Sequence, residues 1–141
     1  MSRFYFAAVA LSVLAVAGLS SAATPDQTGT FVGTLKSKVT AGSSVSTVKS
    51  ELKIEFAADD STTVTLDGAI QLTPQAVLGA TDGLVIFADP AAGLGNSATI
   101  ATVHFKGTTI KGNTTSIVLN TVPTVTLTKS SAGKFKLKKQ P

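Results

Sequence analysis

The sequence predicts an all-β domain, and three observations lead to that prediction. Apolar and polar residues alternate over most of the chain, which is typical of strands with one buried and one wet face. The alternating runs are short, and residues that favour turns separate them. Threonine and valine, which favour strands, are abundant. The clearest example is Ser50–Gly68, where Leu52, Ile54 and Phe56 alternate with charged residues before a turn.

The N-terminal residues have the pattern of a secretory signal peptide. A short start containing Arg3 is followed by the apolar run Phe4–Leu19 and then by the small residues Ser20–Ala23. We expect cleavage near Ala23, with Ala22 as the second choice, and therefore a secreted, periplasmic or cell-surface protein. A retained membrane anchor is the alternative, but the run is shorter than the roughly 20 residues that span a bilayer.

The remainder has the size of one domain. Removing residues 1–23 leaves about 118 residues. We expect a flexible arm over 24–29 and a single all-β domain over 30–141. The chain has no cysteine and therefore no disulfide. No later stretch is apolar enough for a membrane-spanning helix, so we expect that the mature form does not span a membrane.

Turn signals divide the domain into about eight or nine strands, at a spacing typical of sandwiches and barrels. We predict a single antiparallel β-sandwich of the Greek-key or jelly-roll type, with a closed up-and-down β-barrel as the alternative. We expect the five mature phenylalanines in the core, with valine, leucine and isoleucine: Phe31, Phe56, Phe87, Phe105 and Phe135. The expected strands are 30–39, 45–57, 62–72, 84–88, 97–106, 108–110, 114–120, 121–129 and 134–138.

Some stretches carry more specific predictions. Gly33 lies at an inward position, which indicates a bend or a close backbone approach. Thr62–Leu72 is either one strand with a bulge at Gly68 or two strands joined by a turn. Thr73–Gly83 can hold a short helical turn between a proline and a glycine. Leu84–Ala88 is uniformly apolar, which predicts a strand buried on both faces at the centre of the sheet. Two further turns are expected, at 111–113 and 130–133.

Few residues in the mature chain suggest catalysis. His104 is its only histidine, and the alternation places it on the exposed face, opposite Val103 and Phe105. Acid–base catalysis usually pairs a histidine with a positioned partner, and the sequence indicates none. There is no thiol, no G-x-S-x-G motif and no nucleotide-binding loop. We therefore expect no catalytic residue and no cofactor, and hence a protein that is not an enzyme.

Four aspartates are the only candidates for a metal site. Asp59 and Asp60 lie in the turn of the 50–68 hairpin, and Asp82 and Asp89 flank the apolar strand. Neither pair has the spacing of a calcium-binding loop. The favoured interpretation is that they form turns, because aspartate side chains bond to a turning backbone.

The positive charge is concentrated at the C-terminus, in Lys134, Lys136, Lys138 and Lys139. Nucleic-acid binding is not expected, because the mature chain has no arginine and Phe135, the aromatic of the tail, is expected to face inward. Contact with an anionic surface is a second interpretation, and it would be sensitive to salt. The favoured one is that outward lysines on a terminal edge strand discourage edge-to-edge aggregation.

These features suggest an exported, non-enzymatic structural or adhesion module, whose partners are copies of itself or other cell-surface components. Self-assembly by strand addition is one version, with the N-terminal arm as the donated strand. The alternative is a β-barrel carrier whose apolar pocket is lined by phenylalanine and leucine. A third hypothesis is a glycan-active enzyme, which requires the candidate aspartates to converge across one cleft.

Overall fold

The protein is built from antiparallel strands, so the all-β prediction is confirmed. In the computed structural model, residues 27–92, 96–121 and 123–141 are described. The predicted signal peptide over 1–23 and the first residues of the predicted arm lie outside them. The elements are β1 (Gly29–Ala41), β2 (Ser44–Phe56), β3 (Thr62–Leu66), β4 (Ala69–Ile70), β5 (Leu72–Leu78), β6 (Asp82–Ala88), the 3-10 helix η1 (Pro90–Ala92), β7 (Ser97–Lys106), β8 (Thr109–Asn120) and β9 (Thr126–Lys139).

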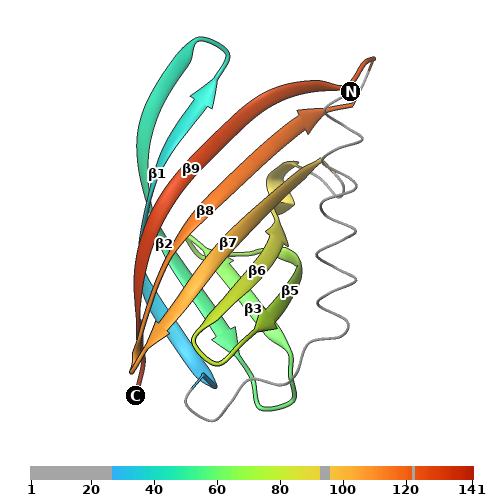
Figure 1. The fold of residues 1–141 in the computed structure, drawn as a ribbon. Coiled ribbons are helices and arrows are strands. Elements are labelled where there is room, and N and C mark those ends of the chain that lie inside the picture. The colour runs from blue at the N-terminus through green and yellow to red at the C-terminus, as the bar shows by residue number, and fades with distance from the viewer. Residues whose placement is uncertain (1–26, 93–95, 122) are drawn as a thin grey trace.

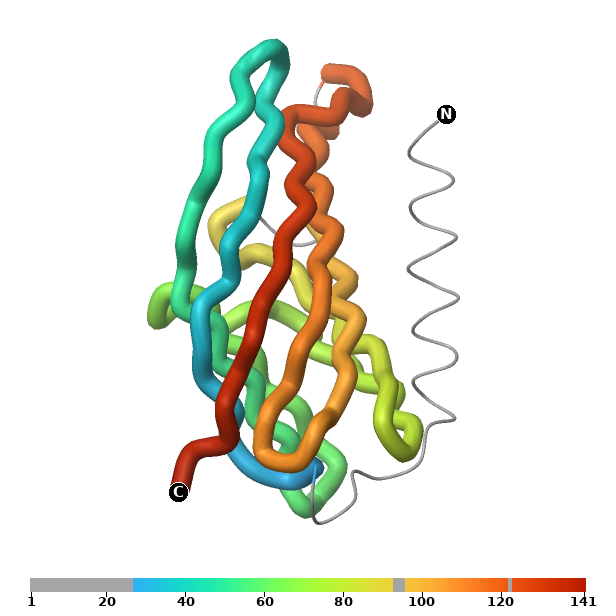
Figure 2. The backbone as a smooth tube through the Cα atoms, turned by 60° about the vertical axis from the view of Figure 1, so that its left-hand side comes forward, coloured from blue at the N-terminus to red at the C-terminus, as the bar shows by residue number. Residues whose placement is uncertain are grey.

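All nine strands form one sheet in the order β4-β3-β2-β1-β9-β8-β7-β6-β5. The sheet curls until β3 and β5, from its opposite ends, come into contact (Figure 1). The amide of Gln71 donates a 2.8 Å hydrogen bond to the carbonyl oxygen of Val64 at this junction. The continuous sheet is therefore nearly barrel-shaped, and its two halves face each other as the layers of a sandwich do. Figure 2 shows the β1–β2 hairpin extending past the neighbouring strand ends.

The core lies inside the curled sheet and contains the five predicted phenylalanines, each at most 8% exposed. Phe31 lies edge-to-face against Phe56 and Phe105, with ring centroids 6.1 and 6.0 Å apart. The predicted hairpin is also confirmed, since Leu52 of β2 pairs with Leu66 of β3. Alternation thus identified which side chains face inward.

Glycines on the inner face allow the sheet to curl. A Cβ atom on Gly33 would overlap with the carbonyl oxygen of Lys136, which confirms the predicted close approach. A Cβ on Gly112 would overlap with the carbonyl oxygen of Thr102 and would lie 2.5 Å from Cζ of Phe135. The neighbouring backbones occupy the space that side chains would need. Strong curvature in these central strands therefore depends on glycine.

The predicted turns at 111–113 and 130–133 are wrong, because these residues lie inside β8 and β9. Gly112 and Gly133 make room for neighbouring atoms and do not reverse the chain. By contrast, Asp67 and Gly68 do form a turn, with φ values of 49° and 83°. Two positive φ values are typical of a tight hairpin connection, and this one joins β3 to β4. The two-strand alternative for 62–72 is therefore correct.

The predicted helical turn after residue 73 is also wrong, because β5 occupies Leu72–Leu78. Pro74 is tolerated there for two reasons. The register with β6 shifts between Leu72 and Gln75, and β5 is the last strand of the sheet. A proline on an edge strand need not remove a ladder hydrogen bond.

The apolar strand β6 has the expected burial but not the expected position. Val85 and Phe87 belong to the core, and Ile86 and Ala88, whose side chains lie on the other face, are also buried. However, β6 is second from the edge, and the C-terminal strand β9 lies at the centre of the sheet. An apolar run indicates burial on both faces, but it does not indicate which strands are its neighbours.

Candidate functional site

The aspartates at the tip of the β2–β3 hairpin form its turn. Oδ1 of Asp59 accepts hydrogen bonds from the backbone amide and the hydroxyl of Ser61, at 3.0 and 2.6 Å. The hydroxyl bond, followed by the amide bond, lowers the pKa of Asp59. Asp60 has a φ of 72°, a left-handed conformation that aspartate tolerates in turns. Both residues thus have the geometry expected of a turn.

The other two candidate aspartates lie at opposite ends of β6. Asp82 is the first residue of β6 and Asp89 directly follows its last residue, so extended strand separates them by roughly 20 Å. Oδ1 of Asp89 accepts a 2.9 Å hydrogen bond from the amide of Ala91. These two carboxylates therefore do not share a cleft. In the described part of the chain, no group of three or more acidic, histidine or cysteine side chains could hold a metal ion.

His104 is exposed, as predicted, but it has a partner that the sequence did not indicate. Nδ1 of His104 lies 2.7 Å from Oδ1 of Asp82, and the two residues are directly paired across β6 and β7. Their side chains are 54% and 75% exposed. The hydrogen bond from His104, followed by one from Thr81, lowers the pKa of Asp82. The pair borders an open hollow of about 390 Å³, which Lys111 and Lys134 also line.

The Asp82–His104 pair should make a small contribution to stability that is lost in acid. Because the pKa of Asp82 is lowered from 3.8 on folding, the stabilisation is present above that pH and disappears as the pH falls below it. We expect Asp82→Asn to reduce the unfolding free energy at about pH 6 and to have a smaller effect at about pH 2.5. Urea denaturation at both pH values measures this. Asp60→Asn is the control, and equal Asp82→Asn effects at the two pH values would contradict the prediction.

The most extensive charged feature is on the outside of the four central strands. Eight exposed lysines occupy outward positions on β2, β1, β9 and β8, and we call this set the lysine face. Glu51 and Glu55 are the acidic residues at outward positions on the same strands. None of the eight lysines forms a salt bridge with a described residue. The lysine face consists of Lys36, Lys38, Lys49, Lys53, Lys111, Lys134, Lys136 and Lys138.

The strand register places these lysines directly beside one another. Lys36 pairs with Lys49 on one side and with Lys134 on the other. In the next row, Lys136 pairs with Lys111. Directly paired residues have Cβ atoms about 5 Å apart, and like charges at that distance destabilise a sheet. The lysine face therefore opposes folding, so the stability of the sheet does not account for it.

The edge-strand interpretation of the C-terminal lysines is wrong. Strand β9 lies between β1 and β8, so neither of its edges is free for another chain. Lys139, the fourth of the C-terminal lysines, pairs with the inward Phe31 and does not lie on the lysine face. The charge thus needs another explanation, and contact with an anionic partner is the interpretation that was left open.

The sequence pointed to only part of the lysine face. Lys36, Lys38, Lys49, Lys53 and Lys111 are distant from the C-terminus in sequence and were not connected with it. A signal was present, because each is next to an inward apolar or glycine position and must therefore point outward. Alternation does not predict which strands pair. The pairing of β1 with β9 brings the lysines of β1 and β2 beside those of β9 and β8.

Comparison with known proteins identifies no relative from which a role for the lysine face could be inferred. No protein-family model matches the chain, and a search of curated proteins finds no significant match. Among the described residues, no helix has the length and apolar character needed to cross a membrane.

Proposed function

We propose that the protein is an exported, non-enzymatic module that attaches to anionic polymers of a cell surface through its lysine face. The single observation that carries the proposal is the cross-strand clustering of unpaired lysines on central strands. Lysines such as Lys36 and Lys134 stand opposite each other although like-charge pairs destabilise a sheet. A polyanion that covers them would remove the repulsion.

The chemistry of the lysine face suits a polymer better than a small ligand. Lysine ammonium groups act as mobile point charges, whereas arginine binds planar anions with fixed geometry. A rigid sheet that carries many such charges binds more strongly as the charge density of its partner rises, which favours a polyanion over a small anion. Binding of this kind is strong at low salt and weak at high salt. Attachment through the lysine face is thus a specific form of the adhesion role that we expect from the sequence.

Surface attachment has more support than strand donation by the N-terminal arm. Gln27, in the arm, is 3% exposed. Its Nε2 donates hydrogen bonds to the carbonyl oxygens of Gly79 and Ala80, at 2.6 and 3.2 Å. The end of the arm is therefore held by its own chain. Export is proposed on the basis of the N-terminal sequence pattern.

Affinity chromatography on immobilised heparin, a sulfated polysaccharide, tests the proposal. We expect the protein to be retained at about 50 mM NaCl and eluted as salt rises, and not to be retained on neutral dextran. The double variant Lys36→Gln/Lys134→Gln removes one cross-strand pair. At roughly 1 kcal/mol per lysine, this should weaken binding about thirtyfold.

The matched control is Lys129→Gln/Lys139→Gln, which changes the net charge equally but leaves the lysine face intact. We expect this control to elute close to the unmodified protein. If both double variants shift elution equally, binding follows net charge and the lysine face has no special role. If the unmodified protein is not retained at low salt, the proposed function is wrong.

A further inference from the structure

The inner face of the sheet changes character along the strands. On β1, the inward Leu35 is followed at the next inward position by Ser37, and on β7, Ala101 is preceded by Thr99. The same change occurs on β2, where Ser50 precedes the buried Leu52. One end of the curled sheet therefore has a continuous apolar core. At the other end, which we call the hydroxyl end, serine and threonine side chains lie among valines such as Val39, Val48 and Val118.

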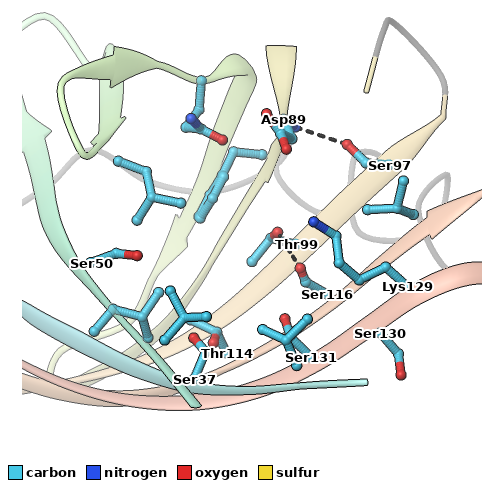
Figure 3. Close-up of a pocket in the computed structure, with 17 residues that line it drawn as sticks. Ser37, Ser50, Asp89, Ser97, Thr99, Thr114, Ser116, Lys129, Ser130 and Ser131 are labelled. Carbon is cyan, nitrogen blue, oxygen red and sulfur yellow. Dashed lines mark hydrogen bonds between the residues drawn. The ribbon is translucent and has the colours of Figure 1, made fainter. Parts of the chain in front are cut away.

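A cavity of about 140 Å³ lies at the hydroxyl end. Apolar side chains also line it, among them the core residues Leu35 and Phe87. Figure 3 shows the serine and threonine side chains that come from several strands around it. The hydroxyl groups that line it include those of Ser37, Ser50, Thr99, Thr114, Ser116 and Ser131.

Several of these hydroxyls have hydrogen-bonding capacity to spare. Thr99 and Ser116 bond to each other at 3.0 Å. In the described part of the chain, no hydrogen bond engages the hydroxyl of Ser37, Ser50 or Ser131. Among the described residues, no fully buried side-chain oxygen or nitrogen lacks a hydrogen-bond partner, so these three hydroxyls remain accessible to solvent. They can therefore bond to water or to a polar ligand that enters the cavity.

Two opposite charges also line the cavity. Lys129 is the lysine among the described residues that line it, and in Figure 3 the ammonium group of this residue extends into the cavity beside Thr99. Lys129 forms no salt bridge with a described residue. Asp89 also lines the cavity, and its Oδ1 accepts a hydrogen bond from the amide of Ala91. Among the described residues, the cavity thus offers an ammonium group that forms no salt bridge, a carboxylate that can accept hydrogen bonds from hydroxyl groups, and several serine and threonine hydroxyls.

We propose that this cavity binds a small hydroxycarboxylic acid. The carboxylate of the ligand pairs with Lys129, and its hydroxyl groups bond to the serine and threonine side chains and to Asp89. An apolar cavity of about 150 Å³ binds a benzene-sized molecule and stays dry. Here a similar volume is lined by hydroxyls, a lysine and a carboxylate as well as by apolar side chains, and it opens to solvent. A polar ligand can therefore enter it and extend out of its mouth. The site differs in this way from the apolar pocket, lined by phenylalanine and leucine, that the carrier hypothesis requires.

Three six-carbon molecules separate the contributions to binding. D-gluconate has both a carboxylate and hydroxyls, sorbitol replaces the carboxylate by a neutral hydroxymethyl group, and hexanoate has the carboxylate without hydroxyls. Each is titrated into the purified 15N-labelled protein while amide chemical shifts are recorded. We expect gluconate to shift the amides of Thr99, Ser116 and Ser131 and to bind at least tenfold more tightly than the other two.

Variants then test the role of the cation. We expect Lys129→Met, which keeps most of the aliphatic stem, to reduce gluconate affinity to that of sorbitol. Lys134→Met, which removes a lysine from the outer face, should leave gluconate binding unchanged but weaken heparin retention. The two sites are thus distinguishable, and either proposal can fail alone.

Two outcomes would overturn the cavity proposal. One is that gluconate at tens of millimolar produces no shifts at the cavity residues of the unmodified protein. The other is that gluconate, sorbitol and hexanoate produce equal shifts there. Because both use the unmodified protein, neither depends on whether a variant folds.

Discussion

Replacing Gly112 with alanine should destabilise the protein by about 3 kcal/mol, near the upper end of the usual cost of overpacking. The added methyl group would overlap with the carbonyl oxygen of Thr102 and would meet the ring of Phe135. The ring can rotate away, but the carbonyl belongs to the backbone of β7. Relief of the overlap therefore requires β7 and β8 to separate or the sheet to uncurl.

The unfolding free energy from urea denaturation measures this effect. Gly107→Ala is the matched control, because Gly107 has a φ of 60° and open space where its Cβ would lie. Alanine at position 107 would therefore lose only about 1 kcal/mol of stability, the cost of a left-handed backbone conformation for a residue with a Cβ atom. If the two variants lose equal stability, close strand packing at Gly112 is not what maintains the curvature.

The contrast between these glycines shows where sequence reasoning reached its limit. Gly107 and Gly112 are five residues apart and both are flanked by polar residues, so both were expected to mark breaks between strands. Only Gly107 turns the chain; Gly112 lies in the middle of a strand and admits a neighbouring backbone. Whether a glycine turns the chain or makes room for a neighbouring backbone depends on which strand packs beside it, and that strand comes from elsewhere in the sequence.

The same limit applies to the candidate site. Alternation correctly placed Val103 and Phe105 inside and His104 outside. It could not identify the neighbour of β9, because every strand presents a similar alternating face and can pair with many others. The contact between β1 and β9 creates the lysine face and removes the edge-strand explanation. Serine and threonine likewise fit either face of a strand, so the hydroxyl-lined cavity could not be predicted.

Replacing Phe31 with alanine should cost about 4 kcal/mol of unfolding free energy, because a fully buried aromatic side chain is lost. Phe31 is the ring that contacts both Phe56 and Phe105 in edge-to-face geometry. Its removal leaves a space in the apolar half of the interior and ends both contacts. Single domains have roughly 5–15 kcal/mol of stability, so this variant should be close to unfolding.

Urea denaturation of Phe31→Ala, Phe31→Leu and Leu127→Ala tests this expectation. Leu127 is a large apolar side chain that is 55% exposed, and its truncation should cost less than about 1 kcal/mol. Phe31→Leu keeps most of the volume and should fall between the other two. If Phe31→Ala costs no more than Leu127→Ala, the phenylalanine cluster does not hold the two halves of the curled sheet together. If the expected order is found, stability depends on the apolar end, and the hydroxyl end is free to carry a polar ligand.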